Sequence, residues 1–143
     1  MNFKKQTMKL NLNRIFYWIS FAWYIYIIGP AAVKKIIQWQ PMMDSMQSLG
    51  FDKNWTIGIG VLETIGVLIV LAGLLKPSLR TLGVLFLFPF AIGAFTAHMA
   101  HQEYHHFYNS LIMCILSAVL LLLDKRIKIN TSENENTIVS SSN

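Results

Sequence analysis

The sequence predicts an all-α integral membrane protein, a bundle of four transmembrane helices with both termini in the cytoplasm. The chain of 143 residues is 54% hydrophobic and only 13% charged, whereas soluble domains are usually about one quarter charged. Four apolar segments approach the roughly 20 residues that a helix needs to cross a bilayer. The basic residues are also distributed unevenly over the connections between these segments, which indicates an orientation.

The four expected spans occupy most of the chain. Their approximate bounds are Ile15–Val33, Trp55–Leu75, Leu79–Met99 and Phe107–Leu123. We therefore expect three parts: a basic cytoplasmic lead at 1–13, a four-helix membrane domain at 14–124 and a cytoplasmic tail at 125–143. The tail is rich in Ser, Asn and Glu, a composition that cannot bury a core and predicts disorder.

The first apolar segment follows several lysines, as a cleaved signal peptide would. It is too long for the apolar region of such a peptide, and Lys34 and Lys35 follow where a small-residue cleavage site would be expected. We therefore interpret it as a retained helix. The two lysines are expected to anchor its outer end at the membrane surface, with a counter-charge for an anion or for Glu63 as the alternative.

The connection at 34–54 is the longest between two spans and is amphipathic. Pro41 could begin a new helical turn there, and the methionines and leucine that follow could form an apolar face. We interpret the segment as an ordinary interfacial loop. The alternative is a short helix lying on the membrane or capping the bundle.

The second span contains Glu63, the only acidic residue in any of the four spans. At 1.5 Å per residue it lies about 12 Å below the outer end of its helix at Trp55. Intramembrane carboxylates are costly and normally face the interior of a bundle. Gly66 lies on the same side of the helix and would permit the close approach of a neighbour. We expect Glu63 to mark a functional contact between helices.

The third span follows a tight connection at 76–80 and so forms an antiparallel hairpin with the second. Near its outer end it contains Gly93, Thr96 and His98, at the same depth as Glu63. A hydrogen bond from Glu63 to His98 or Thr96 is therefore geometrically possible. Pro89 removes one backbone hydrogen bond and is expected to kink the helix and open a small polar cavity.

No metal site is expected from the sequence. The remaining histidines follow the third span, at His101, His105 and His106, and we interpret them as solvated side chains of a short connection. The chain has one cysteine, Cys114 in the fourth span, so thiol–disulfide chemistry within one chain is excluded. Its expected role is packing in the apolar interior.

The distribution of basic residues predicts the orientation. Nine of the 12 Lys and Arg residues fall on the side that holds both termini, and the positive-inside rule makes this side cytoplasmic. The formal charge of +5 is explained by this signal and by attraction to anionic lipid. The basic residues flank spans rather than forming a patch, so the expected contact is the lipid bilayer and not nucleic acid.

These residues together resemble the DoxX-like family. The resemblance rests on GVLETIGVLIVLAG at 60–73 and GAFTAHMA at 93–100, within a four-helix chain, and it covers about 14–124. It implies a small multi-pass protein of the bacterial inner membrane. The founding members are small membrane subunits of a thiosulfate:quinone oxidoreductase, and others are implied to join membrane-bound redox or oxidative-stress assemblies.

The leading hypothesis from the sequence is therefore a membrane subunit of a quinone-linked redox assembly, with a protein partner or a second copy of itself. Glu63 and His98 are the expected catalytic residues, handling protons and binding a carbonyl group. The expected ligand-binding residues are Thr96, Lys34, Gly66 and Gly93, with a quinone as the candidate ligand. The alternatives are a non-catalytic assembly or scaffolding protein and, in oligomeric form, a proton or small-solute conduit.

Overall fold

The structure is a computed structural model that describes residues 2–102 and 107–124, with side chains described from Leu12 onward. This part of the chain is helical and contains no strand. Its five helices are α1 (Asn2–Ile36), α2 (Gln40–Ser48), α3 (Lys53–Ala72), α4 (Pro77–Ala100) and α5 (Tyr108–Leu123). The all-α prediction is confirmed for these residues, while the tail expected at 125–143 lies outside them.

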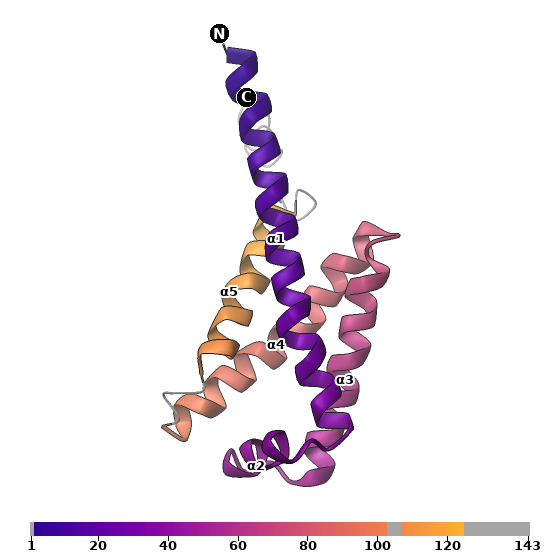
Figure 1. The fold of residues 1–143 in the computed structure, drawn as a ribbon, viewed down its shortest axis with the longest axis vertical. Helices are drawn as coiled ribbons and strands as arrows, with labels where there is room; N and C mark the ends of the chain where they lie inside the picture. The colour runs from indigo at the N-terminus through magenta and orange to yellow at the C-terminus, as the bar shows by residue number, and fades with distance from the viewer. Residues whose placement is uncertain (1, 103–106, 125–143) are drawn as a thin grey trace, which may run out of the picture.

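The four longer helices run alternately up and down (Figure 1). They pack as a ring in which α1 contacts α3, α3 contacts α4, α4 contacts α5 and α5 contacts α1. Helix α2 lies across one end of this ring and contacts α1 and α3 (Figure 1). The α3–α4 connection is at the opposite end of the bundle from α2 (Figure 1).

Three helices are long and apolar enough to cross a membrane: Leu12–Ile36 within α1, all of α3 and all of α4. Helix α5 is apolar but has only 16 residues. At 1.5 Å per residue it spans about 24 Å, less than the roughly 30 Å of the hydrocarbon core. The described residues thus support a multi-pass membrane protein, and the fourth crossing and the orientation stay predictions.

The interpretation of 34–54 as an ordinary loop is wrong, because α2 occupies its middle. Pro41 stands in the first turn of this helix, where its missing N–H group costs nothing. Gly50 has φ +83° and ends the helix, with the amide of Phe51 donating to the carbonyl of Met46 at 2.9 Å. The Met46 side chain is buried, so α2 caps the bundle as the amphipathic alternative predicted.

The interior of the ring is mostly aliphatic and aromatic, but several buried side chains carry hydroxyl groups, among them Tyr24 and Ser117. Tyr24 on α1 and Ser117 on α5 are both 0% exposed. The Tyr24 phenol interacts with Ser117, yet neither hydroxyl has the geometry of a hydrogen bond to any described residue. A buried hydroxyl without a partner costs on the order of 1–3 kcal/mol.

We expect the double substitution Tyr24→Phe with Ser117→Ala to leave the protein at least as stable as the natural chain. The reason is that the substitution removes both unpaired hydroxyls and keeps nearly all of the apolar volume. Equilibrium unfolding in detergent micelles measures the effect, with the two single variants as controls. A loss of stability in the double variant would contradict the expectation, and a double loss smaller than the sum of the two single losses would indicate a stabilising interaction between these hydroxyls.

Candidate functional site

The carboxylate of Glu63 is paired with a lysine of the first helix. Lys35 Nζ donates a hydrogen bond to Glu63 Oε2 at 2.6 Å, and the two side chains are 10% and 8% exposed. Buried ion pairs are stable only when the geometry is close, because desolvation of both charges opposes the attraction between them. The expectation that Lys34 and Lys35 only anchor the helix is therefore wrong for Lys35, which supplies the counter-charge of Glu63.

A glycine one turn before Glu63 brings the two helices together at this point. A Cβ atom at Gly60 would lie 2.7 Å from Lys35 Cβ and 3.2 Å from the carbonyl oxygen of Ala32. Only a residue without a side chain allows α1 and α3 to approach this closely. This short distance between α1 and α3 leaves the Lys35 ammonium group within hydrogen-bond distance of the Glu63 carboxylate.

On its other side, α3 packs tightly against α4 near their connection and diverges from it further along. Glycines make the close contacts, at Gly73 against Arg80, Gly83 against Val70 and Gly66 against Leu87. Beyond these contacts α4 contains Pro89, and a Cβ atom at Gly93 would meet nothing within 4 Å. The hairpin therefore opens toward the end of the bundle that carries α2 (Figure 1).

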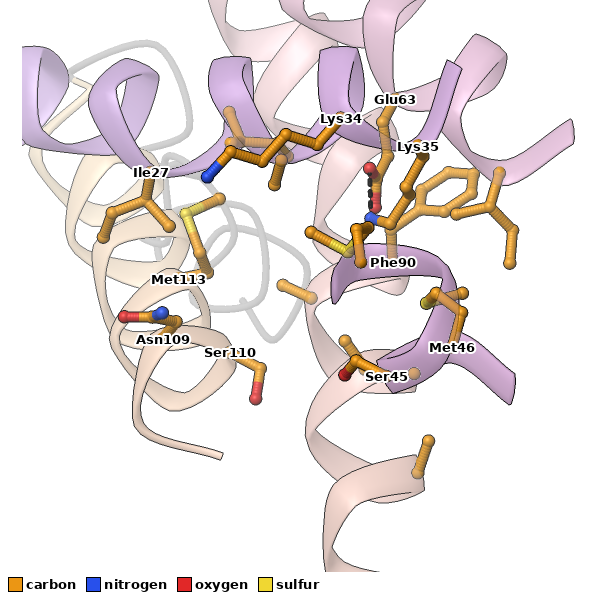
Figure 2. A pocket seen from close by; sticks show the side chains of 18 of the residues that line it. Ile27, Lys34, Lys35, Ser45, Met46, Glu63, Phe90, Asn109, Ser110 and Met113 are labelled. Carbon is orange, nitrogen blue, oxygen red and sulfur yellow. Dashed lines mark hydrogen bonds and ion pairs between the residues drawn. The ribbon is translucent and has the colours of Figure 1, made fainter. Parts of the chain in front are cut away.

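A cavity of about 750 Å³ lies in this open end, and all five helices line it. This volume is within the range of small-molecule binding sites, about 300–1,000 Å³. The polar side chains among its lining residues are Tyr26, Lys34, Lys35, Ser45, Glu63, His98, Asn109 and Ser110. Figure 2 shows the ion pair on one side of the cavity and Asn109, Ser110 and Met113 on the other.

The second lysine of the cavity is held differently from the first. Lys34 Nζ lies 4.5 Å from the centre of the Trp39 ring, a distance typical of a cation–π contact. The Lys34 side chain also lines the cavity. The cavity thus carries two ammonium groups and one carboxylate, which favours a ligand with electron-rich oxygen atoms.

The structure brings together most of the residues expected from the sequence. Glu63, His98, Lys34 and Gly93 line the cavity. Gly66 is the contact point of α3 with Leu87, one turn from Glu63, so it shapes the site without lining it.

Thr96 is placed away from the cavity. It is exposed, and its hydroxyl donates to the carbonyl of Ile92 at 2.9 Å. The described residues contain no cluster of metal-ligating side chains, and His105 and His106 lie outside the described residues.

Sequence reasoning missed the contributions of α2 and α5. Met42 and Met46 of α2 and Ser110 and Met113 of α5 line the cavity. The amphipathic pattern of the segment after Pro41 was the signal for α2. No such signal exists for α5, because its apolar composition indicates burial without saying which residues face the interior.

The fold and the cavity define a class: a small multi-pass helical membrane protein with an internal cavity whose wall contains a buried ion pair. Residues 19–120 match the model of the DoxX-like family, and the chain belongs to this family. The match includes Lys35, Glu63 and His98 as well as most of the four longer helices. No curated protein and no solved structure matches the chain.

Proposed function

We propose that the protein is the small membrane subunit of a quinone-linked redox assembly in the bacterial inner membrane, with both termini cytoplasmic, and that its cavity binds a quinone headgroup. The observation that carries this proposal is the cavity of about 750 Å³ with the Lys35–Glu63 pair and His98 in its wall. Its volume fits a substituted ring, and its mostly apolar lining suits a lipid-soluble molecule.

The polar groups of the wall have complementary tasks in this proposal. Lys35 is a hydrogen-bond donor that is positioned for a carbonyl oxygen. His98 can donate or accept a hydrogen bond through its ring nitrogens. Glu63 orients the lysine through their 2.6 Å contact and relays protons to the ligand as it is reduced. A bound quinone would supply the redox chemistry by taking up two electrons and two protons.

The electrons would come from a protein partner. Cys114 is the only cysteine of the chain, so a dithiol couple within one chain cannot supply them. The protein would therefore hold the quinone and exchange protons with it, while a partner subunit oxidises the electron donor.

Filling the cavity tests the proposal. We expect Gly93→Leu to weaken the binding of decylubiquinone at least ten-fold, because the new side chain would occupy open space in the cavity wall. Binding would be measured by titration of the purified protein in detergent micelles. The control is Ile92→Phe, which adds volume at the neighbouring position, where the side chain is exposed and does not line the cavity.

Equal affinities in the natural chain and the Gly93→Leu variant would overturn the proposal, as would an absence of binding by the natural chain. The absence would instead favour the assembly or scaffolding function. That alternative is supported by one observation, since the buried Lys35–Glu63 pair joins α1 to α3 whether or not a ligand is present.

A further inference from the structure

The cavity reaches deep into the membrane-spanning part of the bundle. Ile27 lines it from α1 and lies nine residues before the end of that helix at Ile36. At 1.5 Å per residue this is a depth of about 13 Å, close to the middle of the hydrocarbon core. A ligand in the cavity would therefore be level with lipid acyl chains.

Exposed residues line the cavity on α1 and α5, and also on α4 at Pro89, Gly93 and Ala94. Tyr26 and Pro30 on α1 and Asn109 on α5 all line it. Each of these residues is also exposed, Tyr26 to 72%. The two helices contact each other nearer the opposite end, where Tyr24 faces Ser117. In Figure 2, Ile27 of α1 and Met113 and Asn109 of α5 lie on the side of the cavity away from the ion pair.

The end of the bundle that carries α2 is closed, in contrast to the side between α1 and α5. Helix α2 covers it, and Met46 on its inner face and Leu49 directly after its last residue are 8% and 7% exposed. Both residues line the cavity. The outward side of α2 is polar, with Gln40 Nε2 donating to Asp44 Oδ1 at 2.7 Å. A path through this end would have to displace a packed apolar helix face.

From these observations we infer that the cavity opens sideways into the bilayer between α1 and α5, and that its ligand comes from the lipid phase with a hydrocarbon chain. The polar head lies against Lys34, Lys35 and Glu63, and the chain leaves past Ile27 and Met113 into the membrane. The nature of the head rests on the proposed function. The position of the opening rests on the cavity alone.

Spin labelling tests the opening without any ligand. The single cysteine is first removed by Cys114→Ala, and a nitroxide is then attached at Ile27→Cys or at Ser45→Cys, which lines the cavity from α2. In lipid vesicles we expect the label at position 27 to collide mainly with oxygen, which concentrates in the bilayer. The label at position 45 should collide more with a water-soluble nickel chelate. Equal access of the chelate to both labels would overturn the inference.

The kinetics of decylubiquinone binding supply the second measurement. Asn109→Trp narrows the opening on the α5 side, and Gln47→Trp adds the same side chain to the exposed face of α2, outside the cavity. We expect Asn109→Trp to slow the association of vesicle-dissolved decylubiquinone at least ten-fold and Gln47→Trp to change it less than three-fold. The reverse order would place the opening at α2. If no quinone binds, the proposed function fails, while the spin-label result still decides the position of the opening.

Discussion

Glu63→Gln is expected to destabilise the protein by about 3 kcal/mol, because breaking a buried ion pair leaves the other charge without compensation. The remaining charge is the Lys35 ammonium group, whose side chain is 10% exposed. The amide of glutamine keeps the shape of the carboxylate, so the loss would report the charge rather than packing. Equilibrium unfolding of the purified protein in mixed micelles measures the change.

The control is a variant without either charge, Lys35→Met with Glu63→Leu. Replacing a buried pair by apolar residues of similar volume is often neutral, and we expect this variant to recover most of the lost stability. A second control is Asp44→Asn on the exposed face of α2, which should change stability little. If the double variant were as unstable as Glu63→Gln, the pair would be a net stabilising contact, and our explanation by an uncompensated charge would be wrong.

Gly83→Ala is expected to cost about 1–3 kcal/mol, the usual penalty for overpacking a close contact. The added Cβ atom would lie 2.6 Å from Val70 Cγ2 and 2.7 Å from the backbone nitrogen of Val70. The backbone of α3 cannot give way as the end of a flexible side chain can, so α3 and α4 would have to separate. The measurement is again equilibrium unfolding in micelles.

Gly93→Ala is the matched control on the same helix. Nothing lies within 4 Å of the Cβ position there, and alanine favours helix by up to about 1 kcal/mol over glycine. We expect this variant to be as stable as the natural chain or slightly more stable. A similar loss in both variants would show that lipid contacts, rather than the α3–α4 contact, determine the effect.

The helices could be predicted from the sequence because a long apolar segment in a bilayer must satisfy its own backbone hydrogen bonds, and a helix does so within one segment. Glu63 could be recognised as an interior residue for the same reason, since exposure of a carboxylate to lipid is so costly. Depth along the helices was predicted well enough to place Glu63 and His98 in one cavity.

The partner of Glu63 could not be predicted from depth. His98 on α4 and Lys35 on α1 both stand near the same end of the bundle, and α3 contacts both helices. Two local features of packing make Lys35, rather than His98, the partner of Glu63. Gly60 holds α1 against α3 beside Lys35, while α4 diverges from α3 after the Gly66 contact and carries His98 to another part of the cavity wall.

The sequence by itself determined that this is a helical multi-pass membrane protein with one costly carboxylate in its interior, because composition and segment length control the transfer of a chain into lipid. Only the tertiary structure decided that Lys35 neutralises this carboxylate, that Thr96 lies outside the site and that α2 and α5 complete the walls of the cavity. These outcomes depend on which helix surfaces approach within a few ångströms. The distance between two helices is set by how the glycines of one pack against the side chains of the other. The spacing of residues along a single helix carries no information about this packing.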